Sequence, residues 1–116
     1  GVAFSAQIIS EKLETEGQIS PAAARIAVIE NTEAISEASG SKLEFLIDEQ
    51  RSIFGMPSTL LVYFVDTNGV PVLFVNSVVT GKYQVTQLIT WRIGSSLRQE
   101  DYDVHSDFLD NLRVMN

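Results

Sequence analysis

The strongest constraint on the fold comes from two apolar segments that a polar turn separates. Residues 58–65 read STLLVYFV and residues 70–79 read VPVLFVNSVV, and both are rich in the β-branched and aromatic side chains typical of strands. Between them, Asn68 and Gly69 tolerate the positive φ angles of tight hairpin turns, and Asp66 can accept hydrogen bonds from backbone amides of the turn. The region therefore predicts an antiparallel hairpin.

The Asp-Thr-Asn-Gly turn also begins like a calcium-binding loop of the D-x-N type. Such a loop needs a third oxygen ligand at its fifth position and a bidentate glutamate at its twelfth, where this chain has Val70 and Ser77. Because turn chemistry accounts for all four residues, we interpret them as the bend between two strands.

Both faces of the predicted hairpin are apolar. An antiparallel sheet with one solvated face has polar residues at alternate positions, and these strands do not. Either helices cover both faces, or helices cover one face and another molecule covers the second. The second alternative predicts a homodimer or a protein partner, because large exposed apolar patches are unusual on a monomer. The residues predicted for this interface are Leu61, Tyr63, Val65, Leu73 and Val75.

A third run, KYQVTQLITWRI at residues 82–93, alternates between apolar and polar side chains and completes a predicted three-stranded antiparallel meander. Its polar side includes Thr90 and Arg92, which we expect at the rim. On its apolar side, Tyr83 and Trp91 could stack on a ring-shaped ligand, and we name them as candidate ligand-binding residues. Packing in the core is the commoner role for such a pair.

Helices are predicted before the meander. Val2, Ala6, Ile9 and Leu13 recur at helical spacing and predict a first helix that ends near Gly17, with a strand through the same residues as the alternative. A second helix is predicted from Pro21 to about residue 39, where Ser20 can cap it and proline suits its first turn. The segment RIAVIENT within it is β-branched enough to be a strand instead.

A third helix is predicted over residues 41–55. Ser41 and Glu44 have the spacing of a capping box, and Gly55 would end the helix before Pro57. Its apolar face would consist of Leu43, Leu46, Ile47, Ile53 and Phe54.

After the meander, the sequence predicts an acidic loop and a short helix over residues 106–115 with Ser106 as its cap. The prediction for residues 1–116 is therefore a single α+β domain. It has N-terminal helices, a three-stranded antiparallel β-meander and a short C-terminal helix.

The acidic segment EDYDVHSD contains the chain's one histidine. If the segment is extended, alternate side chains share one edge and could bind zinc or manganese. A solvated acidic loop that leads into the last helix is the simpler interpretation. The four candidate ligands are Asp101, Asp103, His105 and Asp107.

Several function classes are disfavoured. The chain has no cysteine, no G-x-S-x-G motif and no glycine-rich phosphate loop, so we predict neither an enzyme nor a cofactor. A net charge of −7 repels phosphate backbones, so no nucleic acid is expected, and the longest apolar runs are too short to insert into a membrane. A winged-helix DNA binder and a metal-dependent enzyme remain less favoured alternatives.

The predicted helix at residues 41–55, followed by an apolar strand, DTNG and a second apolar strand to Val79, resembles the opening of extracytoplasmic sensor domains of the PAS or Cache kind. The resemblance implies a sensor input domain with a small-molecule ligand. Because the sequence shows no catalytic constellation and has one histidine, we predict a non-enzymatic module that binds a ligand or partner and regulates another process. An acidic, dimeric protein like a secretion chaperone or an assembly factor is the alternative.

The compartment cannot be read from the sequence. The chain begins at Gly1 without a methionine, so we expect a trimmed N-terminus and no readable targeting segment.

Overall fold

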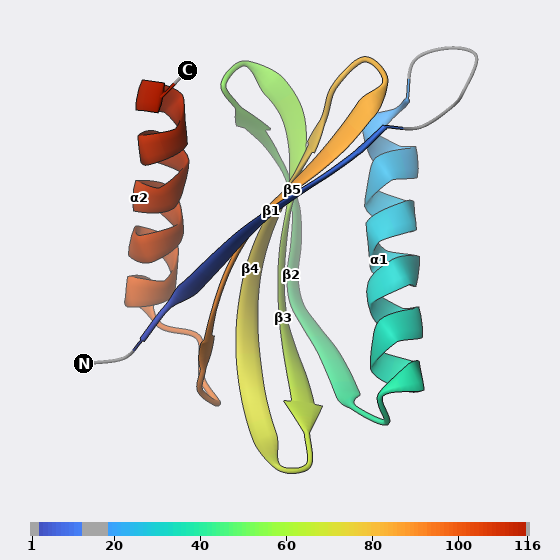
Figure 1. Cartoon of the computed structure of the whole chain (residues 1–116), viewed down its shortest axis with the longest axis vertical. Helices are drawn as coiled ribbons and strands as arrows, with labels where there is room; N and C mark the ends of the chain where they lie inside the picture. The colour runs from blue at the N-terminus through green and yellow to red at the C-terminus, as the bar shows by residue number, and fades with distance from the viewer. Residues whose placement is uncertain (1–2, 13–18, 116) are drawn as a thin grey trace.

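A five-stranded antiparallel sheet lies between two helices in the computed structural model, which describes residues 3–12 and 19–115 (Figure 1). Figure 1 shows the sheet nearly edge-on, with α1 on one side and α2 on the other. The elements follow the order β1 (Ser5–Lys12), α1 (Pro21–Ala38), β2 (Lys42–Ile53), β3 (Met56–Thr67), β4 (Val70–Thr80), β5 (Gln84–Ile93) and α2 (Gln99–Met115).

The strand order across the sheet is β1-β5-β4-β3-β2. Strands β2 to β5 form a continuous meander, and α1 carries the chain from β1 at one edge to β2 at the other. The predicted three-stranded meander is therefore wrong in extent, because its strands correspond to β3, β4 and β5 within a larger sheet.

The turn between β3 and β4 has the conformation that its sequence predicts. Asn68 and Gly69 have φ angles of 54° and 81°, and Asp66 Oδ1 accepts a hydrogen bond from the Gly69 amide at 2.9 Å. Thr67 and Val70 are the last paired residues on either side. The interpretation of DTNG as a bend is confirmed.

Substitution of Gly69 by alanine tests the strain that this turn avoids. A Cβ atom at Gly69 would meet nothing within 4 Å, so the substitution costs stability only through the strain of alanine in a left-handed backbone conformation. We expect a loss of about 1–2 kcal/mol in the free energy of unfolding, measured by urea denaturation. Gly81→Ala is the control, because the φ angle of Gly81 is not positive. Its Cβ would lie 3.4 Å from the Gln84 carbonyl oxygen, a van der Waals contact. An equal loss in both variants would contradict the prediction.

The predicted third helix is wrong, because residues 42–53 form edge strand β2. Leu43 and Phe45 pair with Val65 and Tyr63 of β3, and the register then shifts between Phe45 and Ile47. This β-bulge adds one residue and turns Ile47 to the opposite face of the sheet from Phe45. With the extra residue of the bulge, Leu43, Leu46 and Ile47 have the three- and four-residue spacing of one helical face. Periodicity alone therefore favoured the wrong element.

The end of β2 shows the same ambiguity. Phe54 and Gly55 have φ angles of 54° and 77° and form the two-residue turn into β3. Positive φ at both positions suits a type I′ hairpin turn. The glycine that was expected to end a helix therefore belongs to a hairpin.

Two further helix predictions are corrected and one is confirmed. Residues 5–12 form strand β1, which was the alternative to the first helix, and the rest of that predicted helix lies largely outside the described residues. Helix α1 begins at Pro21, and the Ser20 hydroxyl accepts a hydrogen bond from the Ala23 amide at 3.0 Å. Helix α2 begins at Gln99 and includes the segment that was expected to be a loop.

Each helix covers one face of the sheet, which is why β3 and β4 are apolar on both sides. The α1 face contains Leu61, Tyr63 and Val78 packed with Ala24 and Val28 of α1. The α2 face contains a second core. Its members are Leu60, Val62, Leu73 and Val75, with Leu97 and Tyr102 packed against them.

Both the winged-helix alternative and the sensor-domain resemblance were based on a helix at residues 41–55, and residues 42–53 form strand β2 instead. In the described ranges the two helices lie on opposite faces of the sheet, and a strand, β2, precedes the β3–β4 hairpin. Neither α1 nor α2 is long and apolar enough to cross a membrane, as judged over the described part of the chain.

Candidate functional site

A groove of about 330 Å³ lies beside the C-terminal half of α1. In the first half of this helix, Ala24 and Val28 are buried against the sheet. In the second half, the groove is lined by Asn31, Thr32, Ile35 and Ser36 of the helix and by its C-cap residue, Ser39. Residues three and four apart lie on one side of a helix, so these five residues share a face. Because most of them are small and polar, they leave the space above the sheet unfilled.

The floor of the groove includes part of a row of aromatic rings that crosses four strands. Phe45, Tyr63, Phe74 and Trp91 come from β2, β3, β4 and β5 in turn. Neighbouring ring centroids are 5.3, 5.2 and 5.9 Å apart, and Tyr63 and Phe74 are stacked at 14°. These are favourable spacings for aromatic pairs. Tyr63 and Phe74 themselves line the groove, so it has a flat apolar base.

A row of three polar side chains, Tyr63, Asn76 and Gln87, crosses the α1 face of the sheet diagonally. Asn76 is fully buried, and its Nδ2 donates a hydrogen bond to Gln87 Oε1 at 2.9 Å and contacts the Tyr63 hydroxyl at 3.4 Å. Tyr63 and Gln87 line the groove, whereas Asn76 lies beneath it. With the Gln87 carbonyl engaged by Asn76, its amide N–H group is the end that remains for a ligand. Asn76 therefore holds two groove residues in place from below.

The groove is uncharged at neutral pH. Among the residues that the structure describes, the lining contains no carboxylate, amine, guanidinium or imidazole, and Tyr63 is its one ionisable group. Burial raises the pKa of the Tyr63 phenol, and its hydrogen bonds offset only part of this effect. The remaining residues from the sheet are Gln7, Ile9, Val65, Gln87 and Ile89, together with Phe74. A group bound here meets apolar surface and neutral hydrogen-bonding atoms.

An ion pair joins α1 to the far edge of the sheet. Arg25 Nε donates to both oxygens of Asp48 at 2.9 and 3.0 Å, and its Nη2 also contacts Oδ2. The hydrogen bond to Asp48 raises the pKa of Arg25, and the bond to Arg25 lowers the pKa of Asp48. Since Asp48 belongs to β2, the pair fixes the helix across the sheet from β1.

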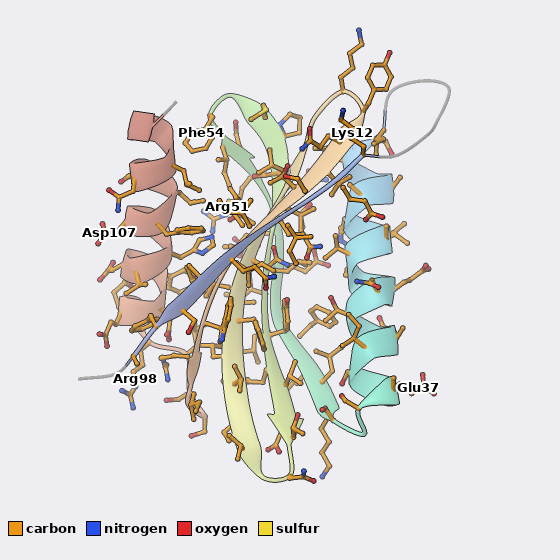
Figure 2. All side chains as sticks on the ribbon, viewed as in Figure 1. Lys12, Glu37, Arg51, Phe54, Arg98 and Asp107 are labelled. Carbon is orange, nitrogen blue, oxygen red and sulfur yellow. The ribbon has the colours of Figure 1, made fainter. Side chains whose placement is uncertain are left out.

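The predicted metal ligands are not brought together, because EDYDVHSD is helical. Asp101 is buried, whereas Asp103 and Asp107 are exposed, and Figure 2 shows Asp107 pointing away from the sheet. His105 is buried and has both ring nitrogens occupied, with Nε2 2.7 Å from Ser77 Oγ and Nδ1 2.8 Å from Thr90 Oγ1. Within the described residues there is no group of three or more side chains that could hold a metal ion.

Burial lowers the pKa of His105 to about 4. The imidazole is therefore neutral at physiological pH, with one ring nitrogen donating and the other accepting. Ser77 and Thr90 are buried beside it, and no carboxylate takes the position that orients the base in a Ser-His-Asp triad. The arrangement is a hydrogen-bonded contact that attaches α2 to β4 and β5.

A buried ion pair attaches the start of α2. Arg92 of β5 and Asp101 of α2 are 3% and 2% exposed, and Nε and Nη2 of the arginine bond to the two carboxylate oxygens. Arg92 Nη2 also donates to the Ser96 carbonyl at 2.6 Å, and Asp101 Oδ2 accepts from the Arg98 amide at 2.8 Å. The bond to Asp101 raises the pKa of Arg92. Arg92 and Thr90 therefore lie under α2, and the prediction that they are at the rim is wrong.

The two predicted ligand-binding aromatic residues are separated. Tyr83 lies in the turn between β4 and β5 and is half exposed, with Lys82 Nζ 5.5 Å from its ring centroid. Trp91 lies near the other end of β5, next to Phe74. Eight residues of extended chain span about 26 Å, so the two rings cannot contact one small ligand.

The five predicted interface residues do not form one surface. The register pairs Tyr63 with Phe74 and Phe64 with Leu73, so Leu61, Tyr63 and Val65 face α1. Leu73 and Val75 face α2 on the opposite side of the sheet. Both groups pack against the chain's own helices, and Tyr63 and Val65 line the groove.

The sequence interpretation missed the groove residues on α1 and the pair Asn76 and Gln87. Two signals were present. The polar pair Asn76-Ser77 interrupts an apolar strand, and Asn31, Thr32 and Ser36 interrupt the apolar pattern of α1. Each signal indicates a polar group at a position where the fold expects apolar packing.

Comparisons with known proteins leave the family open. No protein-family model and no curated protein matches this sequence. Among solved structures, this chain matches a Pseudomonas aeruginosa protein of unknown function that has been suggested to be a regulator. The two chains are 12% identical, the alignment covers 94% of this chain and 81% of the other, and the TM-score is 0.49.

Proposed function

We propose that this protein is a non-enzymatic binding module that holds a small, uncharged and partly apolar ligand in the groove beside α1. The observation that supports this function best is the row Tyr63–Asn76–Gln87, which presents neutral polar groups above a buried amide. A volume of about 330 Å³ is within the range of small-molecule sites.

The ligand class follows from the lining of the groove. An ion would leave water for a site with no countercharge, which is unfavourable. A neutral polar head can bond to Gln87 and Tyr63, while an apolar tail lies on Phe74, Val65 and Ile89. The described lining residues offer no general base or acid apart from a phenol of raised pKa, so we propose binding without chemical conversion.

Three probes of similar shape test this proposal, namely hexanamide, hexanoate and hexylammonium. We expect hexanamide to shift the backbone amide NMR signals of residues around Gln87 and to change the fluorescence of Trp91, the chain's one tryptophan. Hexanoate and hexylammonium should bind at least about tenfold more weakly, because each would place a charge in a neutral site. The cationic probe controls for the negative charge of the protein.

A matched pair of variants locates the site. Asn31 is exposed and lines the groove, so Asn31→Phe should fill the space and abolish the hexanamide shifts, whereas Asn31→Ala should retain them. Circular dichroism confirms that both variants fold. Equal binding of all three probes, or shifts confined to Phe54 and Met56 on the α2 face, would contradict the proposal.

A further inference from the structure

The two edges of the sheet differ in their protection against pairing with another strand. Edge strands carry unpaired backbone groups, and proteins protect them with charges, prolines or bulges. Strand β2 has a bulge at Leu46 and five charged residues. These are Lys42, Glu44, Asp48, Glu49 and Arg51.

Strand β1 has none of these protections over most of its length. Its sequence is SAQIISEK, and its register with β5 runs without a shift from Ser5 to Lys12. The first charge appears at Glu11. Ile8 and Ile9 are 49% and 37% exposed, and as neighbours in a strand they point to opposite faces of the sheet. From Ser5 to Ser10, this edge is regular, uncharged and apolar on both sides.

The space beside β1 is open in the described structure. Every residue of β1 is exposed, and among the described helices and strands it makes extensive contacts with β5 alone. Figure 1 shows β1 in front of the sheet, with α1 and α2 set to either side of it. A strand could therefore approach the edge without displacing a described helix.

We infer that β1 pairs with β1 of a second copy, in antiparallel orientation, to form a continuous ten-stranded sheet across a dimer. In this orientation Glu11 and Lys12 of each copy lie at opposite ends of the shared ladder, so like charges do not meet. A parallel arrangement would set Glu11 against Glu11. The charge pattern of the strand thus favours the two-fold arrangement.

The side-chain pattern also suits a second copy. Directly opposed residues in antiparallel strands point to the same face, so a two-fold axis near Ile8 or Ile9 sets the same isoleucine of both copies side by side. Apolar surface is then buried on both faces of the joined sheet. Gln7 and Ile9 also line the groove on the α1 face, so the second copy would extend one of its walls.

This inference does not depend on the proposed ligand, because it concerns the backbone edge. Sedimentation velocity of the wild-type chain from micromolar to near-millimolar concentration is expected to show a monomer–dimer equilibrium. Ile8→Lys should raise the dissociation constant at least about tenfold, because lysine on an edge disfavours strand pairing. Leu46→Lys on β2 is the matched control, since Leu46 is 39% exposed, against 49% for Ile8, and the charge change is the same. It should leave the dimer intact.

Hydrogen exchange identifies the surface independently. Amides of β1 should become more protected as protein concentration rises, while those of β2 should not change. A monomer at every concentration would overturn the inference and leave the edge free for an extended peptide of another protein. A dimer that Ile8→Lys does not weaken, or that does not protect β1, would overturn it as well.

Discussion

Replacement of Arg92 by alanine is expected to lower the free energy of unfolding by about 3–5 kcal/mol, because it leaves the Asp101 carboxylate buried without its partner. Asp101→Ala should have a similar effect, since it leaves a buried guanidinium unpaired and removes the acceptor for the Arg98 amide. Urea denaturation at neutral pH measures both losses. A loss below about 1 kcal/mol in either variant, which is typical of exposed ion pairs, would contradict the prediction.

The double variant Arg92→Met/Asp101→Leu separates the loss of charge pairing from the loss of packing. It should recover most of the stability, because apolar side chains of similar size need no partner.

Gly94→Ala provides a second check without altering either charge. A Cβ atom at Gly94 would clash with Arg92 Nη1, and the arginine cannot move freely because it donates hydrogen bonds to Asp101 and to the Ser96 carbonyl. We therefore expect Gly94→Ala to weaken the attachment of α2.

The second large effect is that His105 lowers the free energy of unfolding as the pH falls. Its pKa is about 4 in the folded chain and about 6.5 when unfolded, so the unfolded state takes up the proton first as pH falls. The stability is fully present above pH 6.5 and declines towards pH 4. This difference in pKa between the folded and unfolded chain corresponds to a loss of about 3 kcal/mol in the free energy of unfolding. Urea denaturation at a series of pH values measures this slope.

His105→Leu is the comparison for the pH dependence. The variant should be less stable at neutral pH, because Ser77 and Thr90 lose their buried partner, but its stability should vary less between pH 6.5 and 4. Asp48 has a lowered pKa, so its contribution is lost only below its ordinary value of 3.8, outside this window. Equal slopes in the wild type and the variant would show that His105 does not carry the effect.

Buried polar contacts hold α2 to the sheet. Arg92 and Thr90 of β5 and Ser77 of β4 supply polar contacts to Asp101 and His105 at successive turns of the helix. Apolar contacts come from Leu97 and Tyr102 at its start. The attachment therefore depends on buried polar groups whose partners must all be present. In contrast, α1 packs at its first half through Ala24 and Val28 and leaves a groove at its second half.

The candidate site was only partly accessible from the sequence. Tyr63, Val65 and Trp91 had been named, the first two for an interface and the last for stacking, and the structure places all three on the α1 face. Asn76 and Gln87 were not named, because a polar residue within a strand does not reveal which neighbour it faces. That contact depends on the register of β3, β4 and β5.

The sequence by itself determined the elements whose signals are local. Asp66, Asn68 and Gly69 specify the β3–β4 turn through their own backbone preferences, and Ser20 and Pro21 specify the start of α1. The apolar character of β3 and β4 on both sides required a cover on each face, and the chain's own helices provide it. None of these inferences needed a contact between distant residues.

Only the tertiary structure decided the two edge strands and the position of α2. The segment around Leu43, Leu46 and Ile47 has a helical spacing, but its pairing with β3 places a bulge at Leu46 and makes it a strand. Residues 5–12 are a strand because β5 offers an open edge to pair with. Asp101 and His105 become buried partners because the sheet places Arg92, Ser77 and Thr90 opposite them. Strand pairing and buried polar contacts join residues far apart in the chain, so local periodicity cannot predict them.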